Sequence, residues 1–168
     1  MKTTNRNRGL WIALGMFVLL IVALDQLVKY LTVAHIPSGG AVAALPGVLH
    51  LTYVRNTGAA FSILSGSRWL FVVIAVVFFV VLGVMIKKRI VSKPAELWCL
   101  AAIAGGALGN VIDRVATGSV VDMFEVEFME FAVFNVADIF VTCGVIGLIV
   151  FVLIFDRPKK AEEHEADK

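Results

Sequence analysis

The sequence predicts an all-α membrane protein, with four transmembrane helices and a small β element on the outer side of the membrane. The first observation is composition: hydrophobic residues make up 60% of 168 positions and charged residues only 17%, far from the balance of a soluble domain. The second is that the apolar residues gather in four runs of roughly the length, about 20 residues, that a helix needs to cross the hydrocarbon. The runs cover residues 10–30, 69–86, 97–112 and 139–155.

The first run, 10–30, is predicted to be a retained membrane anchor. Lys2, Arg6 and Arg8 precede this apolar run, and a secretory signal peptide also begins with basic residues before its apolar stretch. However, no cleavage site of small residues follows the run. A chain of this length is expected to form a single integral membrane domain over residues 1–168. The net charge of +2 is too small to indicate a nucleic acid partner.

The positions of the basic residues predict the orientation of the chain. Eleven of the fifteen Lys and Arg residues precede the first run, separate the second from the third, or follow the fourth; three lie in the other two connections. Because Lys and Arg gather in cytoplasmic loops, both termini are predicted to be cytoplasmic. Residues 157–168, with mixed charges, are predicted to form a disordered cytoplasmic tail.

Segments between the runs predict the β element. Prolines and glycines break up the connection from Ala34 to Gly66, within which Val48–Val54 and Ala59–Leu64 are predicted short strands. Residues 124–128 alternate apolar and acidic side chains, a period typical of an extended or interfacial segment.

Small residues inside the runs are explained by packing. Gly105, Gly106 and Gly109 are expected to let a neighbouring helix approach the third span closely. Cys99 and Cys143 are expected to pack as small hydrophobes, since neither has a partner at metal-ligand spacing.

Four aspartates are predicted to reach one level near the outer face. A helix rises about 1.5 Å per residue, which places Asp25, Asp113 and Asp138 at roughly 23 to 25 Å from the cytoplasmic ends of their spans. Asp122 is nine residues beyond Asp113 and is therefore tethered to the same level. Acids at such a depth are costly, so each is a candidate for function.

Two of these acids have basic neighbours. Lys29 follows Asp25 by four residues, a spacing that puts both side chains on one helix face. Arg114 follows Asp113 directly, but successive helix residues point apart, so Asp113 is free to pair elsewhere. Structural ion pairing is favoured over catalysis for both acids.

Asp122 and Asp138 have no basic neighbour in sequence. Two carboxylates close together in a poorly hydrated site share one proton, which is the state that aspartic hydrolysis requires, without a metal. The alternatives are an exposed loop acid at 122 and a helix N-cap or first-turn acid at 138.

Four ordered blocks closely resemble the bacterial lipoprotein signal peptidase family, also called signal peptidase II. The blocks are DQLVK (25–29), RNTGAAFS (55–62), GALGNVIDRVATGSVVD (106–122) and FNVAD (134–138). The resemblance implies an aspartic endopeptidase of the bacterial inner or plasma membrane that removes signal peptides from diacylglyceryl prolipoproteins, cutting before the lipidated cysteine. It also implies an extracytoplasmic β-cradle, an active site toward that face and inhibition by globomycin.

By the same matching, Asp122 and Asp138 form the catalytic dyad. The family's supporting residues would be Asp25, Lys29, Asn56, Gly58, Asn110, Asp113, Arg114, Asn135 and Ala137. Asn56, Asn110, Arg114 and Asn135 are expected to bind the substrate backbone or position the dyad. The partners expected are the prolipoprotein and membrane lipid, with no cofactor, no metal and a monomeric enzyme. The histidines receive no role.

Three other readings stay open at this stage. A Ser–Lys peptidase would use Ser62 or Ser65 with Lys29. A proton-coupled transporter or channel would use membrane acids as relays, and it predicts carboxylates spread through the depth of the bilayer. A scaffold protein would need neither unpaired acid.

Overall fold

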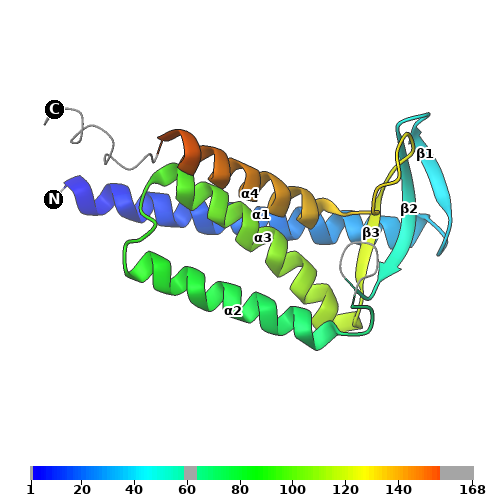
Figure 1. The fold of residues 1–168 in the computed structure, drawn as a ribbon, viewed down its shortest axis with the longest axis horizontal. Helices are drawn as coiled ribbons and strands as arrows, with labels where there is room; N and C mark the ends of the chain where they lie inside the picture. The colour runs from blue at the N-terminus through cyan, green and yellow to red at the C-terminus, as the bar shows by residue number, and fades with distance from the viewer. Residues whose placement is uncertain (1, 59–63, 156–168) are drawn as a thin grey trace, which may run out of the picture.

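Four helices and a three-stranded sheet make up the computed structural model, which describes residues 2–58 and 64–155. The helices run along the long axis of the molecule and the sheet crosses one end (Figure 1). The helices are α1 (Lys2–His35), α2 (Arg68–Lys87), α3 (Pro94–Thr117) and α4 (Val136–Phe155). Each contains a segment long and apolar enough to cross a membrane. The predicted fold class is confirmed.

Each predicted span lies within one helix, but the helices extend beyond the apolar runs. At the start of α3 the Glu96 carboxylate accepts the backbone N–H groups of Ser92 (3.2 Å) and Lys93 (3.1 Å). At its end Gly118 takes a left-handed conformation with φ of 81°, which favours glycine. Hydrophobicity therefore marks the part of a helix inside the hydrocarbon, whereas capping residues mark its ends.

The sheet has the order β1-β2-β3 and is antiparallel throughout. Its strands are β1 (Ala41–Leu45), β2 (Leu49–Asn56) and β3 (Val120–Val126). The predicted strand at 48–54 is found as β2, and the extended prediction at 124–128 holds for the residues of β3, after which the chain bends. Of the predicted strand at 59–64, residues 59–63 lie outside the described residues, and Leu64 is in a turn with φ of 59°.

Helix α3 is the centre of the bundle, packing against α1, α2 and α4. Its glycines are placed where another helix comes close. A Cβ added at Gly106 would overlap the backbone carbonyl oxygen of Ala137, and one at Gly109 would lie 2.6 Å from Asp25 Oδ2. At Gly105 it would lie 2.9 Å from Ile21. The predicted role of these glycines in close helix packing is confirmed.

The interior of the bundle is mainly apolar at the end opposite the sheet. Leu14 of α1, Val91 of the α2–α3 connection and Leu97, Leu100 and Ile103 of α3 form a buried cluster there. Helices α1 and α3 therefore meet through hydrocarbon side chains at this end. Their contacts at the sheet end are of a different kind.

Candidate active site

A cavity of about 590 Å³ lies where the sheet meets the helices. Its polar wall comes from β2 and the residues after it, from α3, from β3 and from the start of α4. The polar side chains are Asn56, Asn110, Arg114, Asp122, Asn135, Asp138 and Thr142. Phe71 of α2 and Phe131 and Phe134 before α4 contribute to an aromatic wall. Segments far apart in sequence thus meet at the level predicted for the four acids.

Asp122 lies in β3, opposite Val54 of β2, and its side chain is buried. Asn56 donates to its Oδ2 (3.0 Å) and Asn135 donates to its Oδ1 (2.6 Å). Burial raises the pKa of Asp122 to about 6; the nearby charge of Asp138 acts in the same direction, while the two amide hydrogen bonds oppose it. Asp122 is therefore a buried strand residue, not the exposed loop acid of the alternative reading.

Asp138 lies in the first turn of α4. It shares a reciprocal cap with Asn135, whose backbone N–H donates to Asp138 Oδ2 (3.2 Å) while the N–H of Asp138 donates to Asn135 Oδ1 (3.0 Å). Asn110 donates to the other carboxylate oxygen (2.8 Å). The first-turn alternative correctly predicted the position, and the same carboxylate also faces the cavity.

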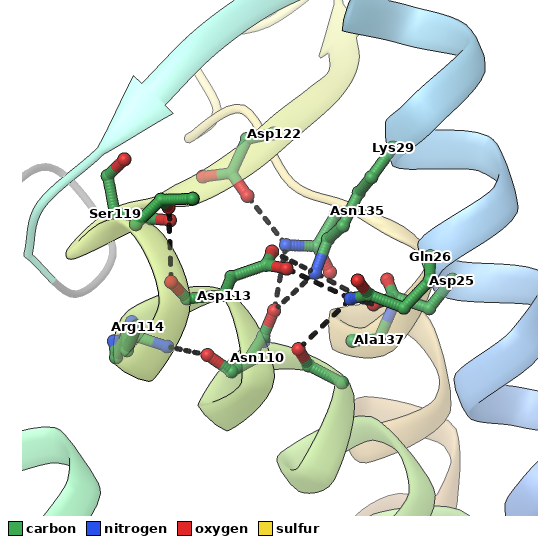
Figure 2. Close-up of polar contacts among 12 residues, drawn as sticks. Asp25, Gln26, Lys29, Asn110, Asp113, Arg114, Ser119, Asp122, Asn135 and Ala137 are labelled. Carbon is green, nitrogen blue, oxygen red and sulfur yellow. Dashed lines mark hydrogen bonds and ion pairs between the residues drawn. The ribbon is translucent and has the colours of Figure 1, made fainter.

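Asn135 connects the two lone acids. Its side chain is wholly buried, and its Nδ2 donates to Asp122 Oδ1 (2.6 Å) and to Asn110 Oδ1 (3.2 Å), as Figure 2 shows. Its backbone N–H and side-chain oxygen hold Asp138. One residue therefore fixes the position of Asp122 relative to Asp138.

Lys29 has three acceptors around its ammonium group. Nζ lies 2.8 Å from Asp25 Oδ2, 2.7 Å from Asp113 Oδ2 and 3.0 Å from Asn110 Oδ1. The predicted pairing of Asp25 with Lys29 is confirmed, and Asp113 pairs with the same lysine. Because lysine only donates, the Asn110 oxygen must face Lys29, so its NH₂ group faces Asp138. Lys29, together with the Asn135 Nδ2 that donates to the same oxygen, thereby sets the amide orientation that supports Asp138.

Gln26 belongs to this network and was not predicted. Its Nε2 donates to Asp113 Oδ1 (2.9 Å), to Asp25 Oδ2 (3.3 Å) and to the Gly109 carbonyl (3.3 Å). Its place beside Asp25, inside the block 25–29, was the signal that could have identified it. Ala137, which was predicted, takes part through its backbone N–H, which donates to Asp25 Oδ1 (2.9 Å).

Arg114 links α3 to the segment after β2 and to α2. Its Nη2 donates to the Gly58 carbonyl (3.0 Å), and its guanidinium lies over the ring of Phe71, 4.6 Å from the centroid. The Gly58 N–H donates to Asn56 Oδ1 (2.9 Å), which directs the Asn56 amide nitrogen to Asp122. Every predicted supporting residue is therefore placed in this network or on the cavity wall.

Cys143 is exposed on the cavity wall, so the expectation that it packs inside the bundle was wrong; an outward face of α4 can carry the same apolar pattern. For the Ser–Lys reading, Ser62 lies outside the described residues and Ser65 is exposed. A lysine base needs a free lone pair, whereas Lys29 is surrounded by three acceptors.

Comparison with known proteins gives a consistent result. Residues 17–154 match the profile of the signal peptidase (SPase) II family. The lipoprotein signal peptidase of Streptococcus pyogenes serotype M2 (strain MGAS10270) is 44% identical over 135 residues, covering 79% of this chain and 87% of the relative. The protein of the same name from serotype M5 (strain Manfredo) gives the same identity and coverage.

Two solved structures share the fold. A bacterial membrane enzyme determined by the in meso method at 2.3 Å resolution superposes with a TM-score of 0.82 at 32% identity, covering 89% of this chain and 93% of that one. A second, at 1.9 Å resolution, gives a TM-score of 0.77 at 33% identity over 86% and 94% of the two chains.

Proposed function

The chain belongs to the signal peptidase II family, and from that premise we propose that Asp122 and Asp138 are its catalytic dyad. The protein is a lipoprotein signal peptidase, an aspartic peptidase that cleaves signal peptides from prolipoproteins. One observation carries the dyad assignment. Within the described residues, Asp122 and Asp138 face the same cavity, form no ion pair and are both held by Asn135.

The two acids take different roles in this proposal. Asp122, whose pKa burial raises to about 6, holds the shared proton. Asp138 is the base, since two N–H donors support its carboxylate at the positive end of the α4 dipole. A water molecule between them loses a proton to Asp138 as its oxygen bonds to the scissile carbonyl carbon, and Asp122 protonates the carbonyl oxygen.

Collapse of the tetrahedral intermediate reverses these transfers. Asp138 gives its proton to the departing amide nitrogen as the C–N bond breaks, and Asp122 recovers its proton from the intermediate's hydroxyl. Both acids return to their starting states. No charge accumulates over the cycle.

The amides and the guanidinium divide the supporting work. Asn56 donates a hydrogen bond to Asp122 and Asn110 donates one to Asp138, so both amides act as positioning residues. Arg114 lines the cavity, and its buried Nε has no hydrogen-bond partner among the described residues. We assign this group to a carbonyl of the substrate backbone, which would give the unsatisfied donor an acceptor.

The surroundings of the cavity suit a lipidated substrate. Aromatic and aliphatic side chains such as Phe71, Phe131 and Ile139 line the same cavity as the acids. This supports cleavage before a diacylglyceryl cysteine whose acyl chains stay in the adjacent leaflet. The basic connections lie away from the sheet, so the active site would face the extracytoplasmic side, with both termini cytoplasmic. A monomeric enzyme remains the expectation.

A synthetic diacylglyceryl prolipopeptide and the purified protein test the dyad. Asp122→Asn and Asp138→Asn should each slow cleavage at least about a thousandfold, because dyad members act as a unit. Glu125→Gln, on the same strand as Asp122, is the matched control and should keep the wild-type rate. Adding a metal chelator should change nothing. Near-normal cleavage by either Asp variant would reject the assignment, and equal cleavage of an unlipidated peptide would reject the substrate preference.

A further inference from the structure

A second cavity, of about 240 Å³, lies between α1, α2 and α3 at the end of the bundle opposite the sheet. Its lining is apolar and comes from all three helices. Small residues create the hollow: a Cβ added at Gly15 of α1 would meet no atom within 4 Å, and Ala101 and Ala104 of α3 line the facing wall. We refer to this cavity as the inner groove.

Helix α2 leaves the inner groove accessible to lipid. No residue of α2 is buried, and α3 is the helix with which it shares extensive contacts among the described residues. Lining residues on α1 run from Trp11 to Val18, a rise of about 10 Å. Water does not enter the hydrocarbon, and an empty apolar hollow forfeits dispersion contacts. An acyl chain would restore those contacts.

The mouth of the inner groove is positively charged. Arg8 lies one turn before Trp11 on α1, and Lys87 follows the lining residue Ile86 on α2; both basic side chains are exposed. Trp11 is 46% exposed, as expected of a tryptophan at the membrane interface. Residues 8–24 and 68–95 contain no Asp or Glu. Glu96, the next acid along the chain, is buried and accepts the backbone N–H groups of Ser92 and Lys93. The groove therefore joins an apolar slot to a cationic rim.

We propose that the inner groove binds an anionic glycerophospholipid. One acyl chain lies along Gly15 and Ala101, and the phosphate is held between Arg8 and Lys87 beside Trp11. The site is at the opposite end of the bundle from the acids, so it is separate from the substrate cavity. It also does not depend on the catalytic proposal, because its readout is lipid binding.

Native mass spectrometry of the purified full-length protein, titrated with phosphatidylglycerol or phosphatidylcholine, tests the site. Phosphatidylglycerol should bind at least about tenfold more tightly. Arg8→Gln and Lys87→Gln should each weaken it about fivefold, the effect of about 1 kcal/mol per basic residue near a membrane surface. Phosphatidylcholine should bind equally to wild type and both charge variants.

A matched pair of glycine variants separates the inner groove from general charge attraction. Gly15→Leu fills the groove and should abolish the tight phosphatidylglycerol site. Gly83→Leu, on α2, also projects into open space but does not line the groove, and should bind like wild type. Circular dichroism and peptide cleavage check that both variants fold. Unchanged lipid preference in folded Gly15→Leu, or equal binding of the two lipids by wild type, would overturn the proposal.

Discussion

The two ends of the bundle are held together by different forces. At the sheet end, buried polar groups such as Lys29, Asp113 and Asn135 connect α1, α3 and the start of α4. At the other end, residues such as Leu14 and Leu97 do so. Lipid is as apolar as leucine, so hydrocarbon contacts gain little from exclusion of solvent and act through close packing. Polar contacts fix which side chains meet, and the sheet end should therefore be the more sensitive to substitution.

The largest effect is expected from Gly106→Val. The new side chain would overlap the Ala137 carbonyl and meet Val141 Cγ2 at less than 3 Å, so α4 must move and take Asp138 with it. We expect neither a monodisperse protein on size-exclusion chromatography nor measurable cleavage. Gly83→Val, which enters open space, should behave as wild type. A folded, active Gly106→Val protein would contradict the expectation that the sheet end is the more sensitive to substitution.

Lys29→Met comes next. It leaves Asp25 and Asp113 without their shared cation, at a cost of about 3 to 5 kcal/mol for a broken buried ion pair. It also removes the shorter of the two hydrogen bonds that orient the Asn110 amide toward Asp138. We expect a lower melting temperature and cleavage at least about a hundredfold slower. Lys88→Met, an exposed lysine of the other end, is the control.

A double variant separates the stability effect of Lys29 from its positioning effect. Adding Asp113→Asn to Lys29→Met removes one of the uncompensated charges, so part of the lost stability should return. Cleavage should stay slow, because the Lys29 hydrogen bond to Asn110 Oδ1 (3.0 Å) is not replaced and the longer bond from Asn135 (3.2 Å) is left to hold the amide. Recovery of the cleavage rate together with stability would show that Lys29 acts through the fold alone.

Asn56→Ala should shift the pH dependence of kcat/KM. The kcat/KM of the wild type should fall as pH rises through about 6, since Asp122 then loses its proton. The Asn56 hydrogen bond favours the ionised carboxylate, so its loss raises the pKa of Asp122 and should shift this limb to higher pH by about one unit. A limb that stays in place, or moves to lower pH, would contradict Asp122 as the acid.

The smallest effect on catalysis is expected from Ile103→Ala in the apolar cluster. Thermal unfolding should show a loss of about 2 kcal/mol, the low end for such a truncation, because lipid lacks the solvent-exclusion contribution. Cleavage below the melting temperature should stay within about twofold of wild type, about 0.4 kcal/mol. A large fall in rate would mean that the two ends are coupled more strongly than their contacts indicate.

Much of the fold could be predicted because the bilayer imposes simple rules. Hydrophobic runs located all four helices. The rise per residue predicted one level for Asp25, Asp113 and Asp138, and the short connection from Asp113 predicted the same level for Asp122. Strand β1 escaped prediction, since its sequence AVAAL has no alternation and all five residues are exposed. Its position depends on pairing with β2, which no local pattern encodes.

The candidate site was predicted less completely. The presence or absence of a basic neighbour in sequence separated Asp25 and Asp113 from Asp122 and Asp138. The supporting residues were predicted from the resemblance to the signal peptidase II family. Neither could show that Asp113 shares Lys29 with Asp25, that Gln26 joins them, or how the Asn110 amide is turned. These features depend on the crossing of α1 and α3, which brings together residues more than eighty positions apart.

Asn135 has one further consequence. The residue that caps the start of the fourth helix also bonds both acids, so under the proposed dyad the same contacts seat that helix and assemble the reactive centre. An unfinished chain would hold its acids apart and could not cut peptide bonds in the crowded membrane into which it is inserted. Hydrolytic activity of the proposed dyad would therefore depend on the fourth helix being in place.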